Sequence, residues 1–268
     1  MTTLTVSSVK VSTGVTLEYV EQGKVSGIPI ICLHGVTDSW HSFEPVLPYL
    51  PDDLRVFAIT QRGHGGSSKP DGYRYGDFAA DVRAFMDAQM LPDAIIAGHS
   101  MGSLVAQRFA VDYPHRVRAL TLMGAFLTLH GDRGLQGYWE STLGPLTDPV
   151  PRDVALEFQL STLEQPIAQS WLDLFVSESL RVPARVWRAT FREFLDTDFT
   201  AELPTIAAPT LMNWGEKDAY CGPTHWAGLQ KQIPHARVRI YDGIGHALHW
   251  EQPERFAQDL VAFARSQR

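Results

Sequence analysis

A serine between two glycines is the first place in this sequence where residue types and spacing point to chemistry. Gly98, Ser100 and Gly102 lie in the stretch GHSMG, where the apolar run DAIIAG gives way to a helical pattern. A chain that passes directly from a strand into a helix must turn sharply at the serine, and the glycines let neighbouring backbone approach without a clashing Cβ atom. Such a turn presents the hydroxyl as a nucleophile. Serine is also a common helix N-cap, so the motif alone leaves a structural role open.

A serine nucleophile needs a base to take its proton and a carboxylate to orient that base. Asp218 follows the strand-like segment PTLMNWG, and His246 follows ARVRIYDG in a glycine-containing turn. Loops at the carboxyl ends of parallel strands meet at one edge of a sheet. We therefore expect Ser100, Asp218 and His246 to come together as nucleophile, orienting acid and base.

Each of these partners has a competitor nearby. His249 lies three residues beyond His246, but the two glycines just before His246 favour a loop that brings its ring to the sheet edge. His99 adjoins the serine, and because adjacent side chains on a tight turn point apart, we expect it to pack or to hydrogen-bond. Glu216 is the alternative to Asp218, and for either carboxylate a solvated loop charge is the alternative interpretation.

The oxyanion of a tetrahedral intermediate needs donors that are already in place, and one donor contributes roughly 3–4 kcal/mol to acyl transfer. The backbone N–H of Met101, directly after the serine at the start of a helix, is one candidate. The N–H of Val36, in the loop LHGVTDSW after the strand-like segment IPIIC, is the other. Gly35 allows close backbone approach in that loop.

The elements that must position these residues alternate along the chain. Short apolar runs interleave with longer amphipathic ones, which indicates parallel β-α-β units with right-handed crossovers. The first 20 residues alternate like a strand, and helices are expected over 75–90, after Ser100 and from 253 to the end. Further strands are expected at 28–35, 55–60, 93–98, 117–124, 209–215 and 236–243.

Between the strand at 117–124 and the strand at 209–215 the pattern changes to helices separated by prolines. The sequence therefore predicts an α/β core domain interrupted by a helical cap, or lid, insertion. The core is expected at 1–125 and 205–268 and the cap at 126–204, with helical segments at 154–162, 167–180 and 184–195.

Aromatic residues are frequent in and near this cap. Most of them are expected to pack, because they recur at helical spacing; the others could line a pocket beneath the cap. Many large apolar residues and few clustered charges favour a small, largely apolar or aromatic substrate. The candidate substrate-binding residues are Trp40, Phe126, Trp139 and Trp187.

Composition argues against several kinds of partner. Hydrophobic residues make up 44% and charged residues 20%, as in ordinary globular proteins. The net charge is −7 with no stripe of Lys or Arg, so nucleic acid is not an expected partner. No apolar run approaches the roughly 20 residues of a membrane helix, and the N-terminus lacks a signal-peptide pattern. Two cysteines, Cys32 and Cys221, build no disulfide framework, which favours the cytoplasm. A monomer and a homodimer are both compatible with the sequence.

Five short motifs in this order resemble the α/β-hydrolase superfamily, and the resemblance covers essentially the whole chain. It implies an α/β-hydrolase fold, with a mostly parallel eight-stranded sheet flanked by helices and a helical cap inserted after the strand at 117–124. The motifs are LHG at 33–35, RGHGGS at 62–67, GHSMG at 98–102, GEKD at 215–218 and GH at 245–246.

The resemblance also implies roles for individual residues. By position, Ser100 is the nucleophile, His246 the base and Asp218 its orienting acid, while the N–H groups of Val36 and Met101 form the oxyanion hole. The implied reaction proceeds through an acyl-enzyme and requires neither a metal nor an organic cofactor. In keeping with this, the sequence has no H-E-x-x-H motif and no phosphate-binding loop.

The sequence departs from the family pattern in AITQRGHGGSS, where Thr60 stands at a position that is Asp in many relatives. This departure concerns the local loop network and leaves the proposed triad untouched.

A carboxylic ester or lactone hydrolase is the leading interpretation, because it demands nothing beyond the residues found. A haloalkane dehalogenase or epoxide hydrolase would need Asp in place of Ser100. Carbon–carbon bond hydrolases and cofactor-free perhydrolases use the same kind of triad and stay open. A ligand receptor with little turnover is the alternative from a different functional class.

Overall fold

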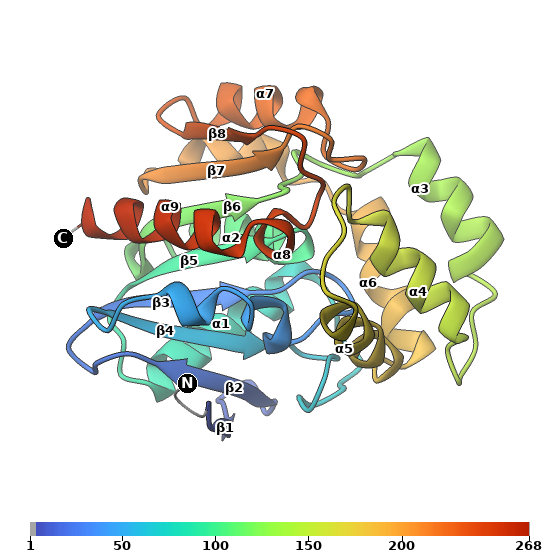
Figure 1. Cartoon of the computed structure of the whole chain (residues 1–268), viewed down its shortest axis with the longest axis horizontal. Helices are drawn as coiled ribbons and strands as arrows, with labels where there is room; N and C mark the ends of the chain where they lie inside the picture. The colour runs from blue at the N-terminus through green and yellow to red at the C-terminus, as the bar shows by residue number, and fades with distance from the viewer. Residues whose placement is uncertain (1–3, 268) are drawn as a thin grey trace.

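An eight-stranded sheet organises residues 4–267, the part of the chain that the computed structural model describes (Figure 1). The strands lie in the order β1-β2-β4-β3-β5-β6-β7-β8. β2 is antiparallel to both of its neighbours, and every pair from β4 to β8 is parallel. The strands are β1 (Val6–Lys10), β2 (Thr16–Gln22), β3 (Ile28–Leu33), β4 (Leu54–Thr60), β5 (Ala94–His99), β6 (Val117–Met123), β7 (Thr210–Gly215) and β8 (Arg237–Tyr241).

The six strands expected between residues 28 and 243 are all present, and the mostly parallel eight-stranded sheet is confirmed. The N-terminal alternating segment differs from the prediction, because a turn splits it into β1 and β2. Gly14 occupies that turn with φ of +85°, a left-handed conformation that glycine adopts without a steric penalty. Residues 1–3 of the predicted strand lie outside the described residues.

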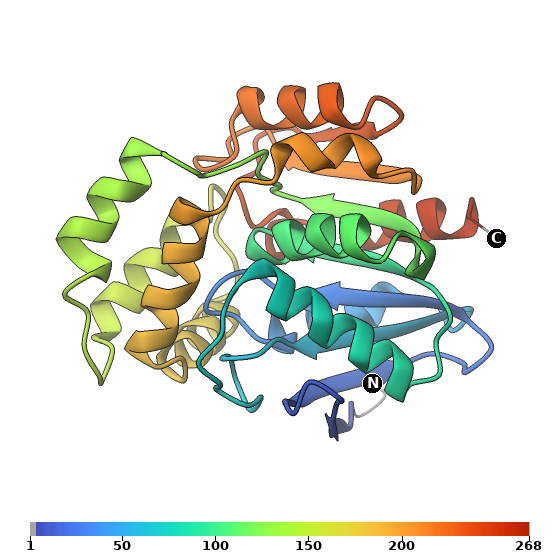
Figure 2. The same cartoon turned by 180° about the vertical axis from the view of Figure 1, so that it is seen from behind.

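Both faces of the sheet are covered, which explains why its central strands are apolar throughout. Successive side chains of a strand point to opposite faces, so Ile31 and Leu33 pack under α1 (Tyr75–Ala88) and α2 (Met101–Asp112). Ile30 and Cys32 pack on the other side, with α9 (Pro253–Arg265). Figures 1 and 2 show these two helical layers from opposite sides.

A group of helices follows β6 and lies beyond the carboxyl ends of the parallel strands (Figure 1). The three helical segments expected there are present, and α3 is an additional helix that its two glycines, Gly134 and Gly137, disguised. The division into a core and a cap at residues 126 and 204 is our interpretation of this arrangement. The helices are α3 (Arg133–Tyr138), α4 (Arg152–Ser161), α5 (Gln169–Leu180) and α6 (Ala184–Asp196).

The remaining helices are short or lie in the core. α7 (Pro223–Gln232) packs on the same side as α1 and α2, and α8 (Leu248–Glu251) immediately precedes α9. Neither α7 nor α8 was predicted from the sequence. A π-helical turn spans Trp139–Leu143, and 3-10 turns span Trp40–Phe43, Leu47–Tyr49, Pro114–Arg116 and Thr200–Thr205.

Both cysteines are buried and unpaired. Cys32 lies within β3, where burial raises the pKa of its thiol to about 12 and keeps it neutral. No helix within residues 4–267 has both the length and the apolar composition needed to cross a membrane.

A buried ion pair fastens the loop after β4 to α1. The Arg62 guanidinium donates to both carboxylate oxygens of Asp81, at 2.7 Å in each case, and also to the carbonyl oxygen of Gly72 at 3.0 Å. The Thr13 hydroxyl donates to the same carboxylate at 2.5 Å. Only 8% of the Arg62 side chain and 4% of the Asp81 side chain are exposed, so either charge would be costly to leave unpaired.

We therefore expect Asp81→Ala to lower the free energy of unfolding by about 3–5 kcal/mol, because it strands a buried guanidinium. Asp87→Ala is the matched control: Asp87 pairs with Arg83 and Arg116 on the surface, where such pairs contribute about 1 kcal/mol or less. Urea unfolding followed by circular dichroism measures both. Equal losses of unfolding free energy in the two variants would show that the buried pair contributes no more to stability than a surface pair.

Candidate active site

Ser100 lies at a sharp turn between β5 and α2. Its φ of 53° and ψ of −117° are unusual for a residue with a side chain, and strain of this kind costs about 1–3 kcal/mol. Hydrogen bonds hold the turn in place: the N–H of Ser100 donates to the carbonyl oxygen of Met123 on β6, and the Ser103 hydroxyl donates to the carbonyl oxygen of Ser100. The strain persists because the surrounding backbone fixes this conformation.

The two glycines of the motif are needed because backbone passes very close to them. A Cβ atom on Gly98 would lie 2.2 Å from the carbonyl oxygen of Gly102. A Cβ atom on Gly102 would lie 2.2 Å from the carbonyl oxygen of Leu33 and 2.7 Å from that of His34. Any side chain at either position would push the start of α2 away from the strands beneath it.

Asp218 and His246 meet across the loops that follow β7 and β8. Nδ1 of His246 lies 2.8 Å from Oδ2 of Asp218, and the other carboxylate oxygen accepts the N–H groups of Tyr220 and Cys221 at 2.8 Å each. Burial acts to raise the pKa of Asp218, but His246 and these hydrogen bonds outweigh it and hold the pKa below its usual value. Asp218 is therefore ionised and accepts the Nδ1–H of His246, which leaves the lone pair on Nε2.

The three alternatives to His246 and Asp218, namely His249, His99 and Glu216, make other hydrogen bonds. Nε2 of His249 lies 3.0 Å from the Ser42 hydroxyl, and burial lowers the pKa of His249 to about 3. Nε2 of His99 lies 3.2 Å from the carbonyl oxygen of His246, and burial holds the pKa of His99 well below its usual value. Glu216 is solvent-exposed and accepts the N–H of Gly243.

Hydrogen bonds made by His34 order the loop that carries Val36. The Gln61 N–H donates to Nε2 of His34, so Nδ1 carries the proton and donates to the carbonyl oxygen of Gly35 at 2.7 Å. Burial keeps His34 neutral by lowering its pKa well below the usual value. The next residue after Val36, Thr37, has a φ of 69°, which is rare for a β-branched side chain.

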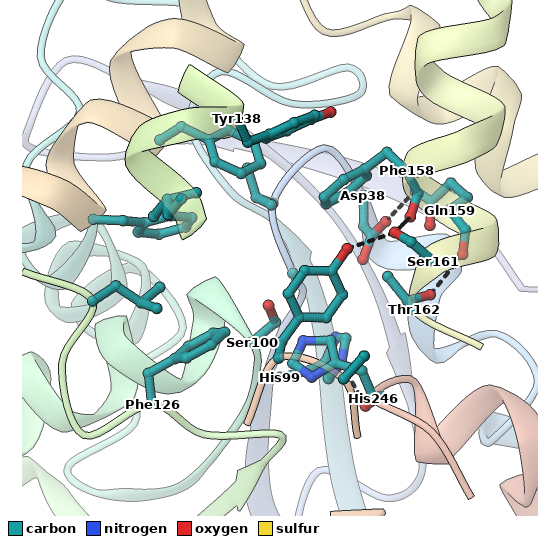
Figure 3. A pocket seen from close by; sticks show the side chains of 18 of the residues that line it. Asp38, His99, Ser100, Phe126, Tyr138, Phe158, Gln159, Ser161, Thr162 and His246 are labelled. Carbon is teal, nitrogen blue, oxygen red and sulfur yellow. Dashed lines mark hydrogen bonds between the residues drawn. The ribbon is translucent and has the colours of Figure 1, made fainter. Parts of the chain in front are cut away.

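Val36 and Ser100 line one cavity of about 510 Å³, and His246 lines it too (Figure 3). Met101 is the first residue of α2, so its N–H is one of those that a helix leaves without an internal partner. In the described part of the chain the Ser100 hydroxyl makes no hydrogen bond, as is common for a nucleophile in the absence of substrate. An aromatic wall on this cavity is formed by Phe126, Tyr138, Phe158, Phe191, Phe194, Tyr220 and Trp250.

Of the four residues predicted to line a substrate pocket, only Phe126 lines the cavity beside Ser100. Trp40 is buried in the core on the α9 side of the sheet and stacks on His41. Trp187 lies on α6 and is fully buried, and its indole N–H donates to the carbonyl oxygen of Ser179. Trp139 lies beneath the Arg192 guanidinium, away from the cavity. These three predictions are corrected, because aromatic spacing marks a packed face without telling which space that face borders.

Several cavity residues were not foreseen, among them Asp38, Gln159 and Tyr220. Asp38 comes two residues after Val36, and Tyr220 comes two residues after Asp218. Closeness in sequence to a candidate loop was therefore a usable signal for these two. Gln159 lies on the helical insertion and carried no such signal.

Tyr220 joins the loop of Asp218 to the helical insertion. Its hydroxyl lies 2.5 Å from the Ser161 hydroxyl at the end of α4, and its ring centroid lies 5.2 Å from that of His246. One residue thus contacts the carboxylate through its backbone and the helical insertion through its side chain.

Cys221 is the one unexpected chemical group beside Asp218 and His246. Among residues 4–267 these three form the one group of His, Cys, Asp or Glu side chains whose ligand atoms gather within 4.8 Å. The Cys221 thiol donates to the carbonyl oxygen of Gly124 at 3.1 Å, and burial followed by the nearby Asp218 holds its pKa well above the usual value. A protonated thiol is a poor metal ligand, so this donor set fits a hydrogen-bond network better than a metal site.

Thr60, which departs from the family pattern, lies opposite Glu18 in the pairing of β2 with β4. Its hydroxyl donates to the Glu18 carboxylate at 3.2 Å and accepts the N–H of Trp40 at 3.1 Å. Glu18 also accepts the N–H of Gly66. The Glu18 carboxylate on the neighbouring strand therefore accepts hydrogen bonds from Thr60 and from the loop after β4.

Comparison with known proteins places the chain in a family. Residues 28–253 match the family model described as alpha/beta hydrolase fold. The chain therefore belongs to the α/β-hydrolase fold family, as the five motifs implied, and its enzyme class is that of a hydrolase.

Similar proteins cover nearly all of the chain. A non-heme chloroperoxidase from Streptomyces lividans is 27% identical over 97% of this chain and 99% of its own. Lipase 1 from Psychrobacter immobilis is also 27% identical, over 97% of this chain and 84% of its own. The crystal structure of a putative aryl esterase from Burkholderia cenocepacia superposes with a TM-score of 0.86 at 23% identity, covering 98% of this chain and 99% of that one. The last likeness concerns the fold.

The close approach at the serine turn predicts that Gly102→Ala lowers the free energy of unfolding by at least about 2 kcal/mol, because its Cβ atom meets fixed backbone. Gly76→Ala is the matched control, since Gly76 is exposed on α1 and a Cβ atom there meets nothing within 4 Å. This control should gain about 0.5–1 kcal/mol. Urea unfolding of both variants tests the contrast, and equal stabilities would contradict it.

Proposed function

We propose that this protein hydrolyses a carboxylic ester or lactone of a small, largely apolar substrate through an acyl-enzyme on Ser100. The observation that carries the proposal is the strained turn that places Ser100 in the same cavity as His246, whose Nδ1 is hydrogen-bonded to Asp218 at 2.8 Å. Nucleophile, base and orienting acid come from three loops at one edge of the sheet.

The chemistry follows from the state of each group. Nε2 of His246 takes the proton of the Ser100 hydroxyl as its oxygen attacks the substrate carbonyl carbon. The N–H groups of Val36 and Met101 hold the resulting oxyanion. His246 then gives the proton to the leaving alkoxide, which departs as an alcohol. Water, deprotonated by His246, attacks the acyl-enzyme, releases the carboxylic acid and restores the serine.

The cavity supports a substrate that is mostly apolar. Its aromatic wall, Phe126 included, buries apolar surface, and about 510 Å³ accommodates a small molecule. No step of this mechanism calls on a metal or an organic cofactor. The lipase among the similar proteins supports ester hydrolysis as the reaction.

Perhydrolysis is the second candidate, favoured by the likeness to a non-heme chloroperoxidase over 97% of the chain. In that reaction hydrogen peroxide takes the place of water. Its oxygen bonds to the acyl carbon as His246 takes its proton, the bond from that carbon to the Ser100 oxygen breaks, a peracid is released, and His246 returns the proton to Ser100. Measuring acid and peracid from one ester, with and without added peroxide, separates the two activities.

We expect Ser100→Ala to lower kcat for p-nitrophenyl butyrate by about 10⁵-fold or more, as in other serine triads. Ser141→Ala is the matched control, because Ser141 is exposed and its hydroxyl lies 3.2 Å from that of Thr142. A fluorophosphonate should add one covalent mass to Ser100 in the unmodified protein. Labelling at another residue, or turnover that survives Ser100→Ala, would overturn the assignment.

Asp218→Asn should lower kcat by roughly 10⁴-fold, since an amide cannot hold His246 in the reactive tautomer. The paired control is Glu216→Gln, which changes the other carboxylate of the same loop and should leave kcat within about two-fold. Steady-state kinetics with thermal melting distinguishes lost catalysis from lost folding. If Glu216→Gln were the damaging change, the orienting acid would have been misassigned.

A further inference from the structure

The cavity lining contains carboxylates but neither an ammonium nor a guanidinium group among the described residues. Asp38, Asp132 and Glu157 line it, and no Lys or Arg of residues 4–267 does. Asp132 and Glu157 are exposed, whereas Asp38 lies deep, with 4% of its surface accessible. Together with the electron-rich faces of the aromatic wall, this lining disfavours an anion and favours a cation.

Asp38 is buried without a positively charged partner on the cavity wall. Its Oδ1 accepts the side-chain N–H of Gln159 at 2.9 Å. Burial raises the pKa of Asp38 to about 7, and hydrogen bonds, foremost that from Gln159, together with His246 offset only part of this rise. A positive group beside this carboxylate would therefore be stabilised.

Gln159 supplies a second, independent sign of a missing ligand. Its Oε1 is buried and has no hydrogen-bond partner within the described residues, although the residue lines the cavity. The orientation of the amide follows from its neighbours. The Ser179 hydroxyl gives its proton to the carbonyl oxygen of Phe175 and so accepts from Nε2 of Gln159 at 2.8 Å. Oε1 is consequently the free acceptor, and a buried free acceptor calls for a donor.

The two acceptors are close enough for one atom to bridge them. Because the oxygen and nitrogen of one amide are about 2.3 Å apart by standard bond lengths, Gln159 Oε1 lies within about 5 Å of Asp38 Oδ1. A single nitrogen can donate to two oxygens at that separation, since each N–H···O distance is about 2.7–3.2 Å. A hydroxyl has one proton to donate, whereas a primary ammonium has three and also a charge.

We propose that Asp38 and the Oε1 atom of Gln159 form a subsite for a primary ammonium group, so that the preferred substrates are esters carrying an amine. This inference rests on the proposed ester hydrolysis for its reaction and on the cavity lining for its specificity. The ammonium group fills the polar corner of the cavity, and the apolar remainder of the substrate packs on the aromatic wall.

Isothermal titration with benzylamine, benzyl alcohol and benzoate tests the subsite without requiring turnover. At pH 8 Asp38 is ionised, and we expect benzylamine to bind at least about ten-fold more tightly than benzyl alcohol, with benzoate weakest. Asp38→Asn should bring benzylamine and benzyl alcohol to within about two-fold of each other, and Gln159→Met should narrow the difference by several-fold. Asp71→Asn is the matched control, because Asp71 is fully exposed and lies outside the cavity lining. This variant should keep the full difference in affinity between benzylamine and benzyl alcohol.

A kinetic comparison links the subsite to the reaction. The ratio of kcat/KM for phenylalanine ethyl ester to that for ethyl 3-phenylpropanoate should fall about ten-fold in Asp38→Asn, and comparing variants cancels the intrinsic reactivity of the two esters. Benzyl alcohol or benzoate binding as tightly as benzylamine to the unmodified protein overturns the proposal, even if Asp38→Asn does not fold. Selective benzylamine binding without ester turnover refutes the proposed function alone, whereas turnover without that selectivity refutes the subsite alone.

Discussion

The close approach of α2 to the strands beneath it is the constraint on which the site depends. Backbone atoms near Gly98 and Gly102 leave no room for side chains, and the turn between them is forced into a conformation that serine rarely adopts. The energetic cost is met by the packed sheet on either side, which cannot relax without exposing fully buried strands. The packing of the core thereby holds the Ser100 hydroxyl in one position.

Around that position the protein arranges mostly neutral imidazoles. Burial keeps His34, His99 and His249 uncharged, and each uses a ring nitrogen to hold a backbone or hydroxyl group. Asp218 is the charged group beside these neutral rings, because His246 and backbone N–H groups stabilise its carboxylate. The only imidazole paired with a carboxylate in this cluster is thus His246, and the contrast distinguishes the proposed base from its neighbours within the described residues.

Much of this arrangement could be predicted from the sequence, for reasons that differ between residues. Ser100, Asp218 and His246 each follow a strand pattern, and parallel topology brings such positions to one edge. Trp40 and Trp187 were misplaced because the helical period identifies an apolar face but not what lies against it. The place of Gln159 in the cavity could not be predicted from the sequence, because its hydrogen-bond partner Asp38 is 121 residues away in the chain. The role of Glu18 beside Thr60 likewise needs the register of β2 against β4.

Tyr220 has a mechanical consequence for any opening of the cavity. Its hydroxyl is bonded to Ser161 on α4, while its backbone N–H holds the carboxylate of Asp218. Lifting α4 away from the sheet therefore breaks one hydrogen bond and pulls on the loop that supports another. The position of α4 and the alignment of the Asp218–His246 pair are in this way linked through a single residue.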